Sequence, residues 1–291
     1  MPEKSSVPRF AFFGTDAFSV GVLEALAARG LPPALVVTAP DRPAGRGLAL
    51  TEPAAKVWAK ARGVALLQPE KLDEAFAAAL ASAGPWDCFA VASYGKIVPR
   101  SVLEVPRCGS LNVHPSLLPR HRGAAPIEAT VLADERETGV TVILMDEKMD
   151  HGPILGRAGI SFDEWPTRPE IEAKLATVGG ELLAELLPKW IAGKIEATPQ
   201  DESAATYTKK LERQDGDLSL AKTEREKFLR VQAMSPWPSA FFTVEHGGKM
   251  VRVKVTAARW DAENQRCVFG RVTPEGHGEM DYASFQNGFL K

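Results

Sequence analysis

The fold of this chain is decided by one stretch, Ser110-Leu-Asn-Val-His-Pro-Ser-Leu-Leu-Pro-Arg-His-Arg-Gly-Ala-Ala-Pro126. It begins with the apolar composition of a buried strand and breaks into a loop at Pro115, which cannot donate a backbone hydrogen bond. Because side chains alternate along a strand, Asn112 and His114 are expected to point to the same face. The pair should therefore lie at the carboxyl end of a strand, where open α/β sheets bind their ligands.

Strand-like and helical segments alternate on both sides of this stretch. Buried parallel strands read as short apolar runs, and helices as apolar residues at a spacing of three to four. The order predicts an α/β fold with a doubly wound, mostly parallel, Rossmann-like sheet. The expected strands are residues 10–14, 34–38, 64–67, 88–92, 138–145 and 153–162, the helices are 17–28, 53–62, 72–83, 126–133 and 168–187, and the loops are 40–47 and 93–99.

A second domain is expected where the helical periodicity stops. Residues 191–206 hold Gly193, Pro199 and several polar side chains, which is typical of a linker. Strand-like pieces then follow at 240–245, 250–257 and 267–272, with turns between them. We therefore predict one large domain over residues 1–190, a linker over 191–206 and a small β-barrel or sandwich over 207–291.

Composition excludes several classes of protein. Of the 291 residues, 45% are hydrophobic and 25% are charged, as in ordinary globular proteins. The formal net charge of −2 excludes a protein whose entire surface attracts nucleic acid electrostatically. The three cysteines are scattered, so we expect reduced thiols and a cytoplasmic location. The amino terminus is polar, and no apolar run is as long as a membrane span, so we expect no membrane partner.

Asn112, His114 and Asp150 have the chemistry of an acyl-transfer site. A neutral amide can donate to an oxyanion, a histidine can move a proton near neutral pH, and a carboxylate can orient that histidine. No GxSxG nucleophile elbow is present, which argues against a covalent hydrolase. A purely structural explanation stays open, with Asn112 at a strand end, His114 satisfied in the core and Asp150 in a turn.

Two arginines, Arg42 and Arg46, lie in the loop at 40–47 with little apolar sequence around them. A short basic loop is usually solvated surface. The alternative is contact with phosphate groups, which the forked guanidinium donors suit.

Two motifs resemble those of a known family. The sequence from Asn112 to Pro119, with Arg122-Gly-Ala-Ala-Pro126, is similar to the signature of folate-dependent formyltransferases, and Met149-Asp150-His-Gly152 is similar to their second motif. The resemblance implies that Asn112, His114 and Asp150 are catalytic and that 10-formyltetrahydrofolate is the formyl donor, with no metal. It also implies a folate pocket made by Tyr94, Gly95, Lys96, Ile97, Val98, Ser116, Leu117, Leu118 and Pro119.

Residues 37–47 are similar to an insertion loop of the family members that act on methionyl-tRNA. The resemblance implies that Arg42 and Arg46 contact tRNA and that the second domain is an OB-like barrel that holds it. We therefore expect a monomer that formylates the α-amino group of methionine on initiator tRNA. The sequence departs from the family at Asp16, because the family turn Gly-Thr-Pro reads Gly14-Thr15-Asp16 here.

Two other functions stay open at this point. One is formylation of a small amine, such as an amino-sugar nucleotide or glycinamide ribonucleotide, although a small acceptor needs neither the basic loop nor the second domain. The other is an RNA-binding protein that has lost catalysis, against which the complete trio of Asn112, His114 and Asp150 argues.

Overall fold

A computed structural model gives the fold and describes residues 7–44 and 49–290. The contacts within the chain divide it into two compact units. The first comprises Met1–Arg122, Gly139–Gly159 and Ala173–Thr206, and the second comprises Gly123–Thr138, Ile160–Glu172 and Tyr207–Lys291. The predicted linear division at residues 190 and 207 stays a prediction.

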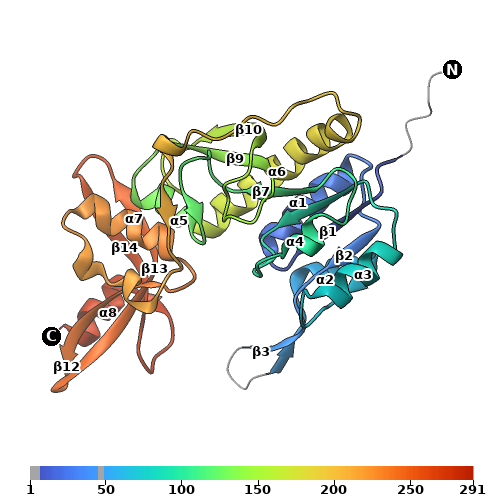
Figure 1. The fold of residues 1–291 in the computed structure, drawn as a ribbon. Coiled ribbons are helices and arrows are strands. Elements are labelled where there is room, and N and C mark those ends of the chain that lie inside the picture. The colour runs from blue at the N-terminus through green and yellow to red at the C-terminus, as the bar shows by residue number, and fades with distance from the viewer. Residues whose placement is uncertain (1–6, 45–48, 291) are drawn as a thin grey trace. The chain divides into compact units, whose positions relative to one another are not determined.

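The first unit is built on one sheet with the strand order β10-β9-β7-β6-β1-β2-β5 (Figure 1). Strands β5, β2, β1, β6 and β7 run parallel, whereas β9 pairs antiparallel with β7. This arrangement confirms the predicted mostly parallel α/β sheet. The strands are β1 (Phe10–Gly14), β2 (Leu35–Val37), β5 (Ala65–Leu67), β6 (Cys88–Ala92), β7 (Ser110–His114), β9 (Glu137–Leu144) and β10 (Ile154–Ser161).

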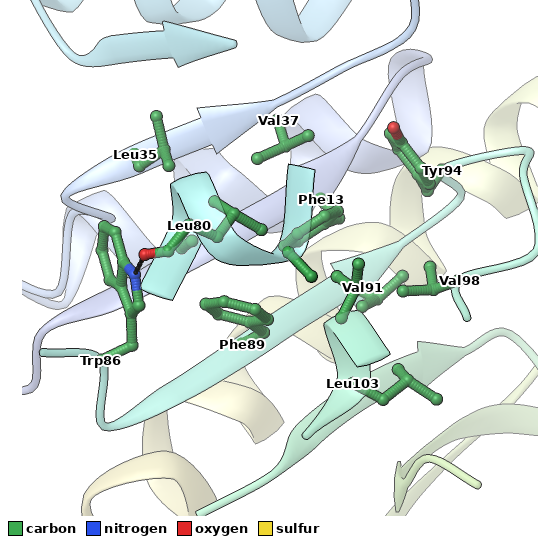
Figure 2. Close-up of a cluster of buried hydrophobic side chains, with 13 residues drawn as sticks. Phe13, Leu35, Val37, Leu80, Trp86, Phe89, Val91, Tyr94, Val98 and Leu103 are labelled. Carbon is green, nitrogen blue, oxygen red and sulfur yellow. Dashed lines mark hydrogen bonds between the residues drawn. The ribbon is translucent and has the colours of Figure 1, made fainter. Parts of the chain in front are cut away.

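Helices cover both faces of this sheet. The helices are α1 (Ala17–Ala28), α2 (Ala54–Arg62), α3 (Glu74–Ser82), α4 (Arg100–Leu103) and α6 (Arg168–Ile191). On one face, Phe13, Phe89 and their neighbours pack with side chains of α3 and α4 (Figure 2). On the other face α1 meets α6, where a Cβ on Gly21 would lie 2.5 Å from Ala176 Cβ. Glycine there lets the two helices approach closely.

The strand order reverses at β1, because β2 and β5 follow on one side and β6 and β7 on the other. The loops after β1 and β6 are joined at this point: Thr15 Oγ1 donates to Tyr94 O at 2.9 Å, and Ser19 Oγ donates to Ala92 O at 2.7 Å. Asp16 caps α1 by accepting a hydrogen bond from Ser19 N at 3.2 Å. An N-capping carboxylate thus occupies the position where the resembled family has Pro.

The prediction of a loop over residues 40–47 is wrong at residues 42–44. Strand β3 (Arg42–Ala44) pairs antiparallel with β4 (Ala49–Thr51), and this hairpin extends away from the main sheet (Figure 1). Pro43 is compatible with a strand here because each strand of a two-stranded ribbon has a free edge. Arg46 lies outside the described residues.

The second unit contains a four-stranded antiparallel sheet in the order β12-β13-β14-β15. This smaller, barrel-like β domain agrees with the predicted fold class. Helix α7 packs on the sheet, and Phe285 of α8 is fully buried. Its elements are α5 (Pro126–Leu132), α7 (Glu224–Met234), β12 (Ala240–His246), β13 (Lys249–Asp261), β14 (Arg266–Pro274), β15 (Met280–Asp281) and α8 (Tyr282–Phe289).

Short elements complete the chain: β8 (Arg122–Gly123), β11 (Tyr207–Thr208) and 3₁₀ turns at Glu202–Ala204, Arg213–Gly216 and Leu218–Leu220. Throughout residues 7–44 and 49–290, no helix combines the length and the apolar character needed to cross a membrane.

Candidate active site

Asn112, His114 and Asp150 come together at the carboxyl end of β7. The Asp150 carboxylate meets both strand residues through one oxygen: Asn112 Nδ2 donates to Asp150 Oδ1 at 3.3 Å, and His114 Nδ1 lies 3.5 Å from the same atom. His114 is buried and Asn112 is half-buried. Side-chain alternation along β7 places Asn112 and His114 on one face, and the chain returns to that face at Asp150. The three predicted residues therefore lie together.

The tautomer of His114 follows from its second contact. His114 Nε2 lies 3.0 Å from the carbonyl oxygen of His121, and a carbonyl oxygen can only accept a hydrogen bond. Nε2 therefore carries a proton, and Nδ1 is the ring nitrogen that faces Asp150.

The loop after β7 is held by side chains rather than by a long strand. Thr141 Oγ1 donates to Ser116 O at 2.7 Å and accepts from Leu118 N at 3.1 Å, while Ser116 Oγ donates to Arg120 O at 2.7 Å. Thr141 stands opposite His114 in the antiparallel pairing with β9. The loop that presents His114 is thereby fixed to the neighbouring strand.

The turn that carries Asp150 is tightly constrained. Asp150 has φ +50°, in the left-handed region that non-glycine residues rarely adopt. A Cβ on Gly152 would lie 1.8 Å from the carbonyl oxygen of Leu144, so only glycine fits there. Earlier in the turn, His151 Nδ1 meets Asp146 Oδ2 at 2.6 Å. The backbone of this turn, not the side chain alone, determines where the carboxylate lies.

Sequence reasoning missed two residues behind this turn, Arg122 and Gln200. Gln200 Nε2 donates to Asp150 O and to Gly152 O, both at 2.8 Å, and Arg122 Nη2 donates to Gln200 Oε1 at 2.8 Å. Arg122 is completely buried, and its hydrogen bonds lower the pKa of the Glu202 carboxyl. Arg122 lies in the signature stretch, but nothing in the sequence connects Gln200 with residue 150.

The predicted folate residues after β6 lie in different environments. Tyr94 and Val98 are buried, whereas Ile97 is 87% exposed. Tyr94 packs edge-on against Phe13, and its hydroxyl, which points out of the cluster in Figure 2, has no hydrogen-bond partner among the described residues. Burial raises the pKa of Tyr94 to about 12. Gly95 has φ +79°, and Lys96 Nζ donates to Pro69 O at 2.8 Å.

The predicted folate residues after β7 lie partly in the core. Ser116 and Leu118 are buried, and Leu118 packs with Ile143 and Ile154. Leu117 is half-buried, and Pro119 O accepts from Thr206 N at 3.3 Å.

A pocket of about 690 Å³ lies between α4 and the turn that leads to Asp150. Its volume is in the range of small-molecule sites. It shares residues 145–148 and His151 with that turn, but none of the predicted folate residues line it. Its lining residues are Arg100, Leu103, Glu104, Pro106, Arg107, Gly109, Ser110, Leu144, Met145, Asp146, Glu147, Lys148 and His151.

The predicted tRNA contact Arg42 is exposed on the β3–β4 hairpin. Its neighbour Asp41 is held at the base of the hairpin by Gln68 Nε2 at 2.7 Å and Lys56 Nζ at 2.5 Å, and these bonds lower the pKa of Asp41. The described part of the chain holds no group of three His, Cys, Asp or Glu side chains arranged for a metal ion.

Comparison with known proteins gives consistent results. Residues 8–187 match the family model described as formyl transferase. The chain is 46% identical over 246 residues to "Methionyl-tRNA formyltransferase" of Anaeromyxobacter dehalogenans, covering 84% of this chain and 78% of the relative. It is 42% identical to the protein of the same name from Chloroflexus aurantiacus, covering 88% and 82%.

Two solved structures share the fold. Methionyl-tRNA formyltransferase from Clostridium thermocellum superposes with a TM-score of 0.61 at 11% identity, covering 93% of this chain and 100% of that one. HypX from Aquifex aeolicus in complex with tetrahydrofolic acid superposes with a TM-score of 0.68 at 17% identity, covering 98% and 48%.

Proposed function

The chain belongs to the methionyl-tRNA formyltransferases of the formyl transferase family, and from that premise we propose that Asn112, His114 and Asp150 carry out its reaction. The reaction transfers a formyl group from a folate-derived donor to the amino group of methionyl-tRNA and so serves translation initiation. The single observation that carries the catalytic assignment is the meeting of an amide, an imidazole and a carboxylate within 3.5 Å at the carboxyl end of β7.

In the proposed mechanism the acceptor amine attacks the formyl carbon of 10-formyltetrahydrofolate. A C–N bond to the amine forms, and a tetrahedral oxyanion develops. The Asn112 amide and protonated His114 stabilise the oxyanion, because fixed donors in a partly buried site need little reorganisation as charge develops. The bond to N10 then breaks, and a proton passes from the attacking nitrogen to N10 with help from Asp150 and His114 Nδ1.

The donor is proposed to bind against the loops after β6 and β7, which hold the predicted folate residues. The pocket of about 690 Å³ includes Gly109 and Ser110 at the amino end of β7, the opposite end of the strand from His114, so we do not assign it to the donor. The buried Tyr94 hydroxyl, unpartnered among the described residues, supports a polar ligand near the loop after β6. Lys96, Ile97 and the segment from Ser116 to Pro119 stay proposed folate contacts.

The acceptor is proposed to be initiator methionyl-tRNA, bound by a monomer in the cytoplasm. Arg42 and Arg46 would contact the tRNA backbone, and the smaller β domain would hold the tRNA. The exposure of Arg42 on a hairpin that projects from the sheet supports this assignment, because phosphate contacts need an accessible guanidinium.

One assay tests the function. The purified protein is incubated with 10-formyltetrahydrofolate and one acceptor at a time: methionyl initiator tRNA, glycinamide ribonucleotide or an amino-sugar nucleotide. We expect donor consumption with the tRNA and none above background with the small amines. Consumption with a small amine alone would overturn the assigned acceptor, and no consumption with any acceptor would overturn the activity.

The substitution Arg42→Ala tests the tRNA contact. Removal of one phosphate contact should raise the KM for tRNA. It should also reduce the slope of log affinity for tRNA against log salt concentration by about 1, with donor binding unchanged. Arg29→Ala is the matched control, because Arg29 is also an exposed arginine but pairs with Glu181 on helix α6. Loss of donor binding in Arg42→Ala with normal use of tRNA would show that the hairpin has another role.

A further inference from the structure

The segment after α6 returns to the catalytic turn. Thr198 forms an isolated antiparallel bridge with Ile154: Ile154 N donates to Thr198 O at 2.7 Å, and Thr198 N donates to Ile154 O at 2.8 Å. Ile154 is the first residue of β10 and lies just after the turn that holds Asp150. Gln200 follows Thr198 by two residues, so the bridge places its backbone beside that turn.

Both the nitrogen and the oxygen of the Gln200 side-chain amide form hydrogen bonds. Its Nε2 donates to the carbonyl oxygens of Asp150 and Gly152, each at 2.8 Å. Its Oε1 accepts from Arg122 Nε at 3.1 Å and from Arg122 Nη2 at 2.8 Å. A primary amide has two N–H donors and one carbonyl acceptor, and all are engaged. The two donated bonds span the turn on either side of His151.

Arg122 determines which way the amide points. A guanidinium has only donors, so it requires the oxygen of Gln200 on its side and thereby directs the NH₂ group to the turn. Its other nitrogen, Nη1, donates to Glu202 Oε2 at 3.0 Å, and the side chain is completely buried. Arg122 also follows His121, whose carbonyl accepts from His114 Nε2. One short segment therefore supports both His114 and, through Gln200, the Asp150 turn.

The turn needs this support because its backbone is unfavourable by itself. Asp150 holds a left-handed φ of +50°, which persists in a non-glycine residue only where the surroundings impose it. Its contacts to Asn112 and His114 are long, at 3.3 and 3.5 Å, so a small shift of the turn would separate the carboxylate from both.

Building on the proposed function, we propose that Gln200 is a positioning residue for Asp150. It fixes the carbonyls at both ends of the turn and so holds the carboxylate against Asn112 and His114. Arg122 fixes the orientation of the Gln200 amide. Gln200 itself contacts neither substrate nor the reacting atoms in this assignment, so its loss should change the rate of the chemical step rather than the binding of either substrate.

The test uses the full chain and the substitution Gln200→Glu. Glutamate keeps the length of the side chain and an oxygen for Arg122, but it offers no donors to the two carbonyls. We expect kcat to fall about 10- to 100-fold, as for other supports of catalytic groups, with the KM values for donor and tRNA within about threefold. Gln200→Asn keeps an amide on a shorter side chain and should recover part of the lost kcat.

Gln232→Met is the matched control. Gln232 is also a buried glutamine whose Nε2 donates to a backbone carbonyl, Ala258 O, but it belongs to helix α7 of the second unit. Its substitution should lower thermal stability with little change in kcat. A fall of kcat in Gln232→Met equal to that in Gln200→Glu would show only a general structural effect and would overturn the proposal.

A double-mutant cycle shows whether Gln200 acts through Asp150. In an Asp150→Asn background, Gln200→Glu should lower kcat by less than about twofold, because the group that Gln200 positions is already disabled. Independent, multiplicative losses, or unchanged kcat in Gln200→Glu, would overturn the positioning role alone. If the unsubstituted chain transfers no formyl group to methionyl-tRNA, the proposed function fails instead and takes this inference with it.

Discussion

Two aspartates in this molecule have nearly the same strained backbone but very different surroundings. Asp150, in the first unit, has φ +50°, and Asp134, in the second, has φ +51°. Asp134 is bound by Arg225 Nε at 2.9 Å, Arg225 Nη2 at 2.8 Å and Trp165 Nε1 at 3.1 Å. Asp150 meets Asn112 and His114 at 3.3 and 3.5 Å.

The difference in distance indicates a difference in role. Short, charge-assisted bonds close the Asp134 site: Arg225 also binds both carboxylate oxygens of Glu164 at 2.8 Å and lies over the rings of Phe228 and Trp260. Such a site is stable but has little left to offer a ligand. The distances from Asp150 to Asn112 and His114 are longer, as is common for catalytic groups whose contacts tighten when the substrate binds.

The largest effect that would test this comparison is on turnover. Asn112→Ala and His114→Ala should each lower kcat at least about 100-fold, because loss of one oxyanion donor typically costs about 2.7–4 kcal/mol of barrier. The melting temperature should change little in Asn112→Ala, since that contact to Asp150 is long. It should fall somewhat in His114→Ala, because the ring is buried and also contacts His121 O at 3.0 Å. The measurement is single-turnover formyl transfer with saturating donor, together with a thermal melt. Near-normal turnover in both variants would place catalysis elsewhere.

The next effect is on stability. Arg225→Ala should lower the free energy of unfolding by about 2 kcal/mol, because it removes the charge-assisted bonds to Asp134 and Glu164, two carboxylates that are 35% and 38% exposed and so partly screened by water. Arg136→Ala is the matched control, since Arg136 contacts the same Asp134 and Glu164 at 3.3 and 3.5 Å but is 43% exposed. That control should cost about 1 kcal/mol or less. Urea unfolding measures both, and equal losses would contradict the assigned role of Arg225.

The smallest effect is the pH dependence of that stability. Hydrogen bonds from Arg225 are the main cause that lowers the pKa of Asp134. For Glu164, burial acts to raise the pKa, but the hydrogen bonds from Arg225 and Trp165 N and the charges of Arg225 and Arg136 together outweigh it, so that this pKa is also lowered. Stability from carboxyls with lowered pKa values is present above their unfolded values, near pH 4, and is lost as the pH falls through the folded values. The difference between the unsubstituted chain and Arg225→Ala should therefore narrow below about pH 4. Urea unfolding from pH 3 to 7 checks this, and a constant difference would exclude the ion pairs as its source.

Much of the sheet could be predicted because local sequence determines buried strands. The apolar runs at Phe10–Gly14 and Cys88–Ala92 are strands with those bounds, and α1 spans Ala17–Ala28 as its periodicity predicts. The hairpin at Arg42–Ala44 was missed because its strands pair only with each other and bury no alternating apolar face. The antiparallel direction of β9 was not predictable, since the pattern of buried residues is the same for either direction.

The sequence by itself determined the α/β class, the strand that ends at His114, and the placing of Asn112 and His114 on one face, because alternation and the Pro115 break are local properties of the chain. It also supplied the motif that contains Asp150. Only the tertiary structure decided that Asp150 reaches both side chains, that His114 presents Nδ1 to it, and that Gln200 returns from 50 residues away to hold its backbone. Those contacts depend on φ angles, bridges and the burial of Arg122, which are set by the packing of distant segments and leave no periodic trace in the sequence.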